Sequence, residues 1–196
     1  IGGTYMHRVA GALLTPTTLA PDGSFITSLA IDATNPTTSF GLFGQAGYKL
    51  TPALEVQAGL RWSHDREGST GTIAITPSPF GPGSLVIPAS AGTYSKGVFS
   101  GKVGLNWTVS PAHFIYVFGA KGYKSGGPNI GSPVGFEPET VWDYELGWKA
   151  KLFDGKLRTQ INGFYMIYEN FQTTKFDIFT TNTGTTNLTS SSKIYG

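Results

Sequence analysis

The chain of 196 residues has no cysteine and few charged side chains. Without thiols it can form neither disulfides nor thiolate metal sites. Charged residues make up 13% of the sequence, which is about half the share usual for soluble domains. A net charge of +2 is too small to indicate nucleic acid as a partner. These absences exclude disulfide-rich folds and nucleic-acid binding, and they raise the question of what the uncharged surface faces.

Long apolar runs are also lacking, although mean hydropathy is close to zero at −0.06. No continuous apolar segment is long enough for a transmembrane helix. Residues 73–95 carry no charge and contain four prolines, at 77, 79, 82 and 88. Because proline breaks helices, this stretch is predicted to be a loop.

What the chain has instead is a repeated alternation of apolar and polar residues. The alternation is clear in residues 54–65, 99–109 and 140–152, and less regular in residues 40–50, 114–123 and 156–171. A period of two predicts β-strands with one apolar and one polar face. Segments of about ten residues exceed the usual strand of soluble domains, whereas nine to eleven residues suit a tilted strand that crosses a bilayer.

The connections between these segments fall into two kinds. Tight turns with Pro or Asp-Gly chemistry are predicted at residues 50–54, 109–113 and 153–156. Long loops are predicted at residues 9–38, 67–94, 125–138 and 172–190, which are rich in Gly, Pro, Ser and Thr. Short turns on one side and long loops on the other are typical of outer-membrane barrels.

Aromatic residues are expected at two levels. Tyr48, Trp107 and Trp148 lie near the tight turns, whereas Trp62 and Trp142 lie toward the long loops. Two such levels match the aromatic girdles at the two membrane interfaces. The alternative is a soluble β-sandwich with buried Trp residues, which strand length and loop asymmetry both oppose.

Several segments, taken together and in order, resemble the barrel of a TonB-dependent outer-membrane receptor. They are YVFGAKGYKSGG (116–127), FEPET (136–140), YELGWK (144–149), LFDGKLR (152–158), FGQ (43–45) and GLRW (59–62). The resemblance implies an all-β, transmembrane antiparallel barrel of 22 strands with long extracellular loops and short periplasmic turns. Residues 1–196 are then expected to be a fragment of the barrel domain, without the plug domain and the C-terminal closing strand.

The resemblance also implies a function and a location. It implies active transport across the outer membrane of a Gram-negative cell, with energy from a TonB-type inner-membrane complex and the lipid bilayer as surroundings. The closest likeness is to receptors for ferric siderophores, so the ligand is expected to be an iron chelate, with no covalently bound cofactor. A passive porin-like channel and a secreted β-rich adhesin remain as alternatives.

Two sets of candidate residues follow from the strand pattern. The set expected to meet a ligand at the outer mouth is Arg61, Asp65, Tyr123, Lys124 and Asn129. The set expected to face the plug or the lumen is Glu55, Lys102, Glu145, Lys149 and Arg158. Lysine and arginine at the mouth would attract an anionic chelate.

Enzyme and metal chemistry find little support in the sequence. The glycine-rich stretch from Lys121 to Gly127 has the wrong order for a phosphate-binding loop, and no helix is predicted after it. His7, His64 and His113 lack the spacing of metal ligands. The chain is therefore predicted to be neither an enzyme nor a metal-binding protein.

Overall fold

The computed structural model describes residues 1–14, 17–19, 21–22, 25–76, 83–129, 135–177, 182–188 and 191–196. In that part of the chain all regular structure is β-strand. The strands are β1 (Gly2–Leu14), β2 (Thr17–Leu19), β3 (Phe25–Thr51), β4 (Leu54–Thr76), β5 (Leu85–Ser110), β6 (His113–Lys124), β7 (Glu139–Leu152), β8 (Leu157–Glu169), β9 (Gln172–Asp177), β10 (Asn182–Asn187) and β11 (Ser192–Tyr195). No helix among the described residues is long and apolar enough to cross a membrane.

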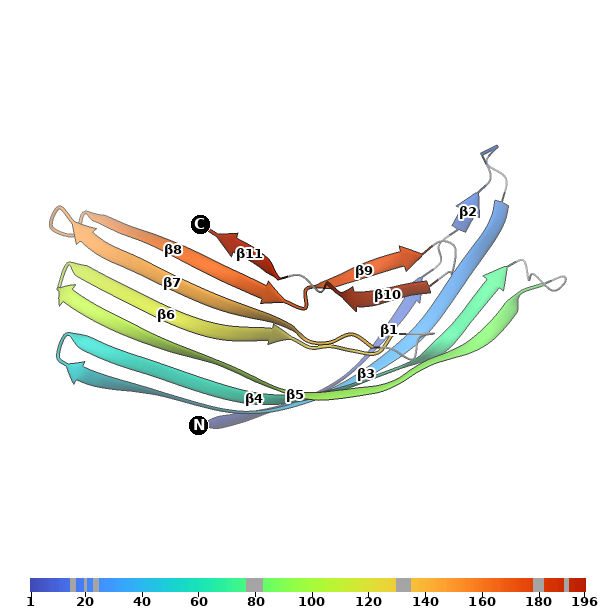
Figure 1. Cartoon of the computed structure of the whole chain (residues 1–196), viewed down its shortest axis with the longest axis horizontal. Helices are drawn as coiled ribbons and strands as arrows, with labels where there is room; N and C mark the ends of the chain where they lie inside the picture. Colours follow the sequence, from blue (N-terminus) through green and yellow to red (C-terminus); the bar gives the residue numbers. More distant parts are fainter. Residues whose placement is uncertain are drawn as a thin grey trace.

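The strands form one long antiparallel sheet that follows the chain. Its order is β1-β3-β4-β5-β6-β7-β8-β11, with β2 paired to β3 at one end. Strands β9 and β10 form a separate hairpin. Figure 1 shows a curved sheet that does not close on itself, with the two chain ends far apart across it. The predicted all-β, antiparallel fold is confirmed, and the described part forms an open section of wall.

All three predicted tight turns are confirmed, and Figure 1 shows them together at one end of the sheet. In the β3–β4 turn, the Thr51 hydroxyl accepts hydrogen bonds from the backbone N–H groups of Ala53 (3.2 Å) and Leu54 (3.0 Å). Ser110 does the same for Ala112 (3.2 Å) in the β5–β6 turn. These side chains replace backbone partners that the chain loses where it reverses.

In the β7–β8 turn, the chain reverses direction through residues with positive φ. Phe153, Asp154 and Gly155 all have positive φ, at 53°, 57° and 82°. Glycine and aspartate tolerate this region, whereas phenylalanine does not favour it. The Asp-Gly pair in the sequence therefore marks the turn correctly.

The predicted long loops are wrong over much of their length. The loop expected at residues 9–38 contains the ends of β1 and β3, which pair continuously from Gly2↔Phe43 to Leu14↔Ile31. The loop expected at residues 67–94 contains the ends of β4 and β5, paired from Glu67↔Tyr94 to Ile75↔Leu85. These strand ends are rich in Thr, Ser, Gly and Ala, so no apolar alternation marks them, yet cross-strand backbone hydrogen bonds hold them. Residues 77–82 lie outside the described residues.

The other two predicted loops fare differently. Between Ser125 and Pro138 the described residues form no strand, and a single bridge joins Gly127 to Phe136, so this prediction is confirmed there. The loop expected at residues 172–190 contains the β9–β10 hairpin, which the sequence pattern did not indicate.

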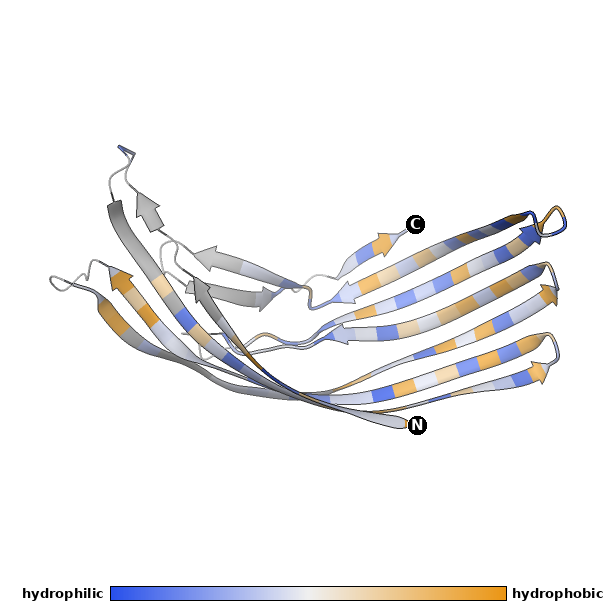
Figure 2. Ribbon diagram, turned by 180° about the vertical axis from the view of Figure 1, so that it is seen from behind, coloured by the Kyte–Doolittle hydropathy of each residue, from blue (hydrophilic) through white to orange (hydrophobic). Residues whose placement is uncertain are grey.

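Strand register places the predicted faces on opposite sides of the sheet. Paired residues point to the same side, and Glu55 is paired with Asn106, Asn106 with Tyr116, and Tyr116 with Gly147. The side that carries Glu55 is called the polar face below, and the other the apolar face. Figure 2 shows the resulting alternation along the strands near the tight turns.

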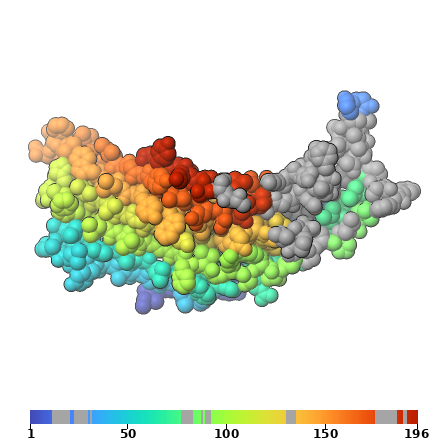
Figure 3. Space-filling view, viewed as in Figure 1, coloured from blue at the N-terminus to red at the C-terminus, as the bar shows by residue number. Residues whose placement is uncertain are grey.

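The distribution of burial is the reverse of that in a soluble domain. Among the side chains that the structure describes, the buried apolar ones are Ala33 and Ala150, while the buried polar ones are Ser63, Asp65, Ser69 and Gln172. On the apolar face Leu60, Val103 and Leu146 are each about three-fifths exposed, at 61%, 58% and 58%. The space-filling view shows the long, curved outline of this sheet (Figure 3). Such a sheet is stable only if something apolar covers the apolar face.

Candidate functional site

At the end opposite the tight turns, another segment of the chain covers part of the polar face. There the connection between β6 and β7 leaves the sheet and lies across the polar face of β4 and β5. Tyr123 donates a hydrogen bond to Asp65 (2.8 Å), and Ser125 donates one to Glu67 (2.9 Å). The last β5–β6 pair is Gly101↔Lys121, so β6 parts from its neighbour before these contacts form.

Three of the predicted mouth residues are brought together here. Asp65 is 7% exposed and accepts hydrogen bonds from Ser39 (2.6 Å) and Tyr123 (2.8 Å). Arg61 lies on the same face of β4, four residues before Asp65, and donates hydrogen bonds to Ser63 (2.8 Å) and Thr4 (2.7 Å). The site is therefore a set of polar side chains already bound to one another.

The other two predicted mouth residues are placed differently. Lys124 is exposed at the end of β6, where it is paired with Glu139 in the strand register. Asn129 lies beyond it in the β6–β7 connection. Whether any of the five contacts a ligand stays a prediction.

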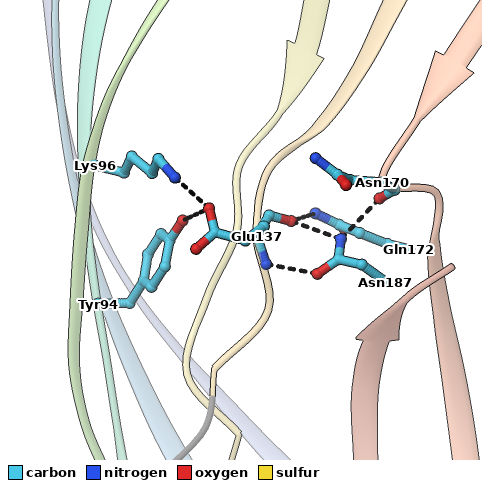
Figure 4. Close-up of polar contacts among 6 residues, drawn as sticks. All are labelled: Tyr94, Lys96, Glu137, Asn170, Gln172 and Asn187. Carbon is cyan, nitrogen blue, oxygen red and sulfur yellow. Dashed lines mark hydrogen bonds and ion pairs between the residues drawn. The ribbon is translucent and has the colours of Figure 1, made fainter. Parts of the chain in front are cut away.

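Glu137 joins three parts of the chain, as Figure 4 shows. Its carboxylate forms an ion pair with Lys96 and accepts a long hydrogen bond from Tyr94 (3.5 Å), both on β5. Its backbone N–H donates to the side chain of Asn187 (2.6 Å), and its carbonyl accepts from Asn187 (2.9 Å) and Gln172 (3.2 Å). We call Tyr94, Lys96, Glu137, Gln172 and Asn187 the Glu137 clamp.

The clamp extends to the β9–β10 hairpin. Asn187 also donates to the carbonyl of Asn170 (2.7 Å), and Gln172 donates to the carbonyl of Ser125 (2.8 Å). The backbone N–H of Gln172 donates to Glu139 (2.9 Å). The clamp therefore holds β5, the β6–β7 connection and the hairpin in one arrangement.

Two buried glycines allow the connection to lie this close to the sheet. A Cβ atom on Gly126 would lie 2.3 Å from the carbonyl oxygen of Phe136 and 2.7 Å from the hydroxyl of Tyr94. A Cβ atom on Gly127 would lie 2.8 Å from a carboxylate oxygen of Glu67. At Gly126 the nearest atom belongs to the backbone, so glycine is required by close approach; at Gly127 a larger residue would have to displace the neighbouring side chains.

Burial shifts the pKa values of three side chains at this end of the polar face, those of Glu67, Tyr94 and Tyr123. Burial raises the pKa of Glu67; the hydrogen bond from Ser125 opposes this shift, and the nearby charge of Asp65 adds to it. Burial, together with the carboxylates of Glu137 and Glu67, raises the pKa of Tyr94 to about 12. Burial is also the largest cause that raises the pKa of Tyr123. Both tyrosines are therefore neutral hydrogen-bond donors at physiological pH.

Nearer the tight turns, the polar face carries the predicted plug-facing charges. The register places Glu55, Lys102, Glu145, Lys149 and Arg158 on this one face. Their contact with a plug stays a prediction. Glu145 accepts a hydrogen bond from Tyr116, and the ammonium of Lys102 lies 3.4 Å from the centre of the Phe118 ring.

Sequence reasoning missed an aromatic ladder among these charges. Phe114, Tyr116 and Phe118 lie on the polar face of β6, with successive ring centres 6.3 Å apart. Lys149 lies 5.3 Å from the Tyr116 ring, a cation–π arrangement. Because β6 is apolar on both faces, alternation alone could not assign its sides, although aromatics at every second position were a usable signal.

The wall, its tight turns and its polar inner surface can be compared with known proteins. A family model described as "TonB dependent receptor-like, beta-barrel" matches residues 2–196. The chain belongs to this receptor family. The apolar face is accordingly the lipid-facing side of a barrel wall, and the polar face looks into the barrel.

Two solved structures share the fold. One is the ferric yersiniabactin uptake receptor FyuA from Yersinia pestis, with a TM-score of 0.64 and 19% identity over 87% of this chain and 26% of that one. The other is the alcaligin outer-membrane receptor FauA from Bordetella pertussis, with a TM-score of 0.60 and 16% identity over 99% of this chain and 35% of that one. The chain thus spans about a quarter to a third of these receptors, and identities this low show the fold alone.

Within the described ranges, no group of three or more His, Cys, Asp or Glu side chains could hold a metal ion. The family comprises receptors and transporters, which agrees with the expectation that the chain is not an enzyme.

Proposed function

We propose that the chain is a section of the barrel wall of an outer-membrane receptor that imports a ferric siderophore by TonB-coupled uptake. The family supports the receptor role. The printed names of two fold relatives, a ferric yersiniabactin uptake receptor and an alcaligin receptor, support the ligand class. Iron here is cargo, carried inside its chelate.

The observation that carries this proposal is the arrangement of the polar face. Toward the extracellular end, the polar face carries the hydrogen bonds of Asp65 and the Glu137 clamp, with Lys124 exposed beside them. Toward the periplasmic end, it carries the aromatic ladder with Lys102 and Lys149. An anionic chelate would be attracted by the exposed lysine at the rim. Arg61 and Tyr123 then supply donors that can exchange their present partners for chelate oxygens.

The same face carries a buried polar atom that has no hydrogen-bond partner among the described residues. Within the described part of the chain, Oδ1 of Asp143 is buried and accepts no hydrogen bond. A buried carboxylate oxygen without a partner is costly, by about 1 to 3 kcal/mol.

The test uses the full-length receptor in cells whose own siderophore receptors are deleted. Uptake of radioactive iron is measured with a panel of ferric siderophores, with and without the TonB protein and with and without an uncoupler of the proton gradient. The proposal expects saturable uptake of at least one chelate that stops without TonB. Uptake that continues without TonB would instead favour the passive channel.

A second measurement separates the barrel from a secreted adhesin. The full-length protein should fractionate with the outer membrane and migrate faster on a detergent gel before heating than after, because an intact barrel resists the detergent. A soluble protein whose migration does not change with heating would contradict both transport functions.

A further inference from the structure

Near its extracellular end, the apolar face changes from aromatic and apolar residues to polar ones. One level of paired residues there is aromatic or apolar and consists of Gly3, Leu42, Trp62 and Phe99. Two residues further along each strand the level consists of Tyr5, Phe40, His64 and Gly97. The next level on the same face is polar and consists of His7, Thr38, Arg66 and Ser95, which we call the basic rim. A polar row thus lies directly beyond the aromatic residues.

The charge of Arg66 is not neutralised by its neighbours on this face. In the register its side neighbours are Thr38 and Ser95, and along the strand they are His64 and Gly68. None of the four is acidic, and the Arg66 side chain is exposed. A guanidinium that faces outward without a carboxylate beside it can bind an anion that does not belong to the chain.

The remaining rim residues add donors around Arg66. His7 shares a hydrogen bond with Thr38 (Nδ1···Oγ1, 3.1 Å), and Ser95 shares one with His64 (Oγ···Nε2, 3.0 Å). Two hydroxyl groups therefore stand on either side of Arg66, each held in place by a histidine. Guanidinium and hydroxyl groups together are the donors that phosphate oxygens favour.

The height of the rim can be estimated from strand geometry. Strand β4 begins at Leu54 beside a tight turn, and Arg66 follows at a distance of about 40 Å along the strand, given a rise of roughly 3.4 Å per residue. A tilt of about 35–45° reduces this to about 30 Å along the membrane normal, whereas the apolar band of such barrels is about 25 Å tall. Arg66 then lies just beyond the hydrocarbon, at the level of lipid headgroups.

We propose that the basic rim binds the phosphate group of a phosphorylated lipid in the outer leaflet. Arg66 holds two phosphate oxygens, and Thr38 and Ser95 donate their hydroxyl hydrogens to the phosphate. The acyl chains of the same lipid lie along Tyr5, Phe40 and Trp62 below, where Phe40 and Trp62 already form an edge-to-face pair with ring centres 6.1 Å apart. The proposal rests on the place of the barrel in the outer membrane and is independent of the cargo.

The structure offers a matched control for Arg66. Arg8 follows His7 on β1 and is also exposed, but it pairs with Thr37 and so points to the polar face. Arg66→Gln and Arg8→Gln each remove one positive charge at nearly the same height. The two variants therefore differ in the face that loses the charge.

The experiment uses the purified full-length receptor and measures bound lipid by native mass spectrometry. The probes are phosphatidic acid, diacylglycerol with the same acyl chains, and inorganic phosphate as a competitor. Wild type and Arg8→Gln should retain phosphatidic acid in preference to diacylglycerol, and inorganic phosphate at equal concentration should not displace it. Arg66→Gln should lower the affinity for phosphatidic acid by roughly fivefold or more, the loss of one charge-assisted contact.

Three results would overturn the proposal. Equal binding of phosphatidic acid by Arg66→Gln and Arg8→Gln would remove the role of the rim, provided that both variants show the wild-type shift on heating. Equal binding of diacylglycerol would remove the role of phosphate, and displacement by inorganic phosphate would remove that of the lipid. If instead lipid binding depends on Arg66 but no chelate is transported, the proposed cargo fails while the lipid site stands.

Discussion

The two ends of the wall are built in different ways. At the periplasmic end, neighbouring strands are joined by turns of a few residues, and their faces alternate in a regular manner. At the extracellular end, β3, β4 and β5 continue far beyond β6, while the β6–β7 connection folds across their polar face. The first end depends on a repeating pattern, and the second depends on individual contacts.

This difference suggests where substitutions will matter. At the periplasmic end the residues of the polar face have equivalent neighbours, so single changes on that face should be tolerated. At the extracellular end Glu137, Asn187 and Gly126 have roles that no neighbour repeats. Single substitutions in the full-length receptor can test this contrast.

Gly126→Ala should open the connection most strongly. The added methyl group would overlap the Phe136 carbonyl and the Tyr94 hydroxyl, and such overpacking costs about 1 to 3 kcal/mol. Amide hydrogen exchange at Gly127 and Phe136, which hydrogen-bond to each other, should become about tenfold to a hundredfold faster. The control is Gly11→Ala, where the nearest atom would lie 3.8 Å away. Unchanged protection in Gly126→Ala would mean that the connection does not pack as described.

Asn187→Ala should release the hairpin from the connection. It removes three hydrogen bonds, two to Glu137 and one to Asn170, which lie at exposed positions. We expect a loss of about 1 to 2 kcal/mol in local stability, seen as faster exchange at the Glu137 amide. Asn162→Ala, at an exposed position of β8, serves as the control and should have no effect there. Equal exchange in both variants would show that the clamp does not hold the hairpin.

Docking of the connection should weaken as pH rises from mild acid to neutral. Burial raises the pKa of Glu67 above its ordinary value of 4.5, so the docked form favours the protonated carboxyl. This contribution is complete below pH 4.5 and is lost as pH rises through the raised pKa. Exchange at Gly127, corrected for intrinsic rates, should therefore speed up over this range in the wild type. Glu67→Gln keeps the oxygen that accepts from Ser125 and should remove the pH dependence; a dependence that persists would assign it to another group.

Lys124→Ala should have the smallest effect on stability, within about 0.5 kcal/mol, because the side chain is exposed. If Lys124 attracts an anionic chelate, the variant should show a higher KM for uptake at low salt with an unchanged amount of receptor. Lys151→Ala, an exposed lysine at the periplasmic end, is the matched control. Identical uptake by both variants would leave Lys124 as a solvated rim residue.

The periplasmic end could be predicted from the sequence because its physics is local. Apolar and polar residues alternate from Leu54 to Asp65, and the Pro and Asp-Gly turns are encoded within four residues. The side chains that face lipid must be apolar and those that face the barrel interior can be polar, so alternation carries the fold directly. For the same reason the five plug-facing candidates could be placed on one face.

The extracellular end could not be predicted in the same way. Beyond the membrane a strand need not present one face to lipid, so residues 25–38 mix Thr, Ser, Asn, Asp and Pro with their apolar residues, and the sequence pattern predicts a loop there. The contact of Tyr123 with Asp65, and that of Glu137 with Asn187, join residues 58 and 50 positions apart. Such pairs follow from the path of the connection, which no local pattern encodes. Asp65 and Tyr123 were selected as candidates, whereas Glu67, Tyr94, Lys96 and Glu137 were missed.

The most direct test of the barrel-wall account is a spin-label scan along β5 in the full-length receptor, reconstituted in lipid. Single labels at residues 102–108 are examined for collisions with oxygen, which concentrates in lipid, and with a water-soluble nickel complex. The account predicts a period of two, with labels at Val103, Leu105 and Trp107 exposed to oxygen and those at Lys102, Gly104 and Asn106 shielded from it. The same collision profile at odd and even positions would contradict the assignment of the two faces.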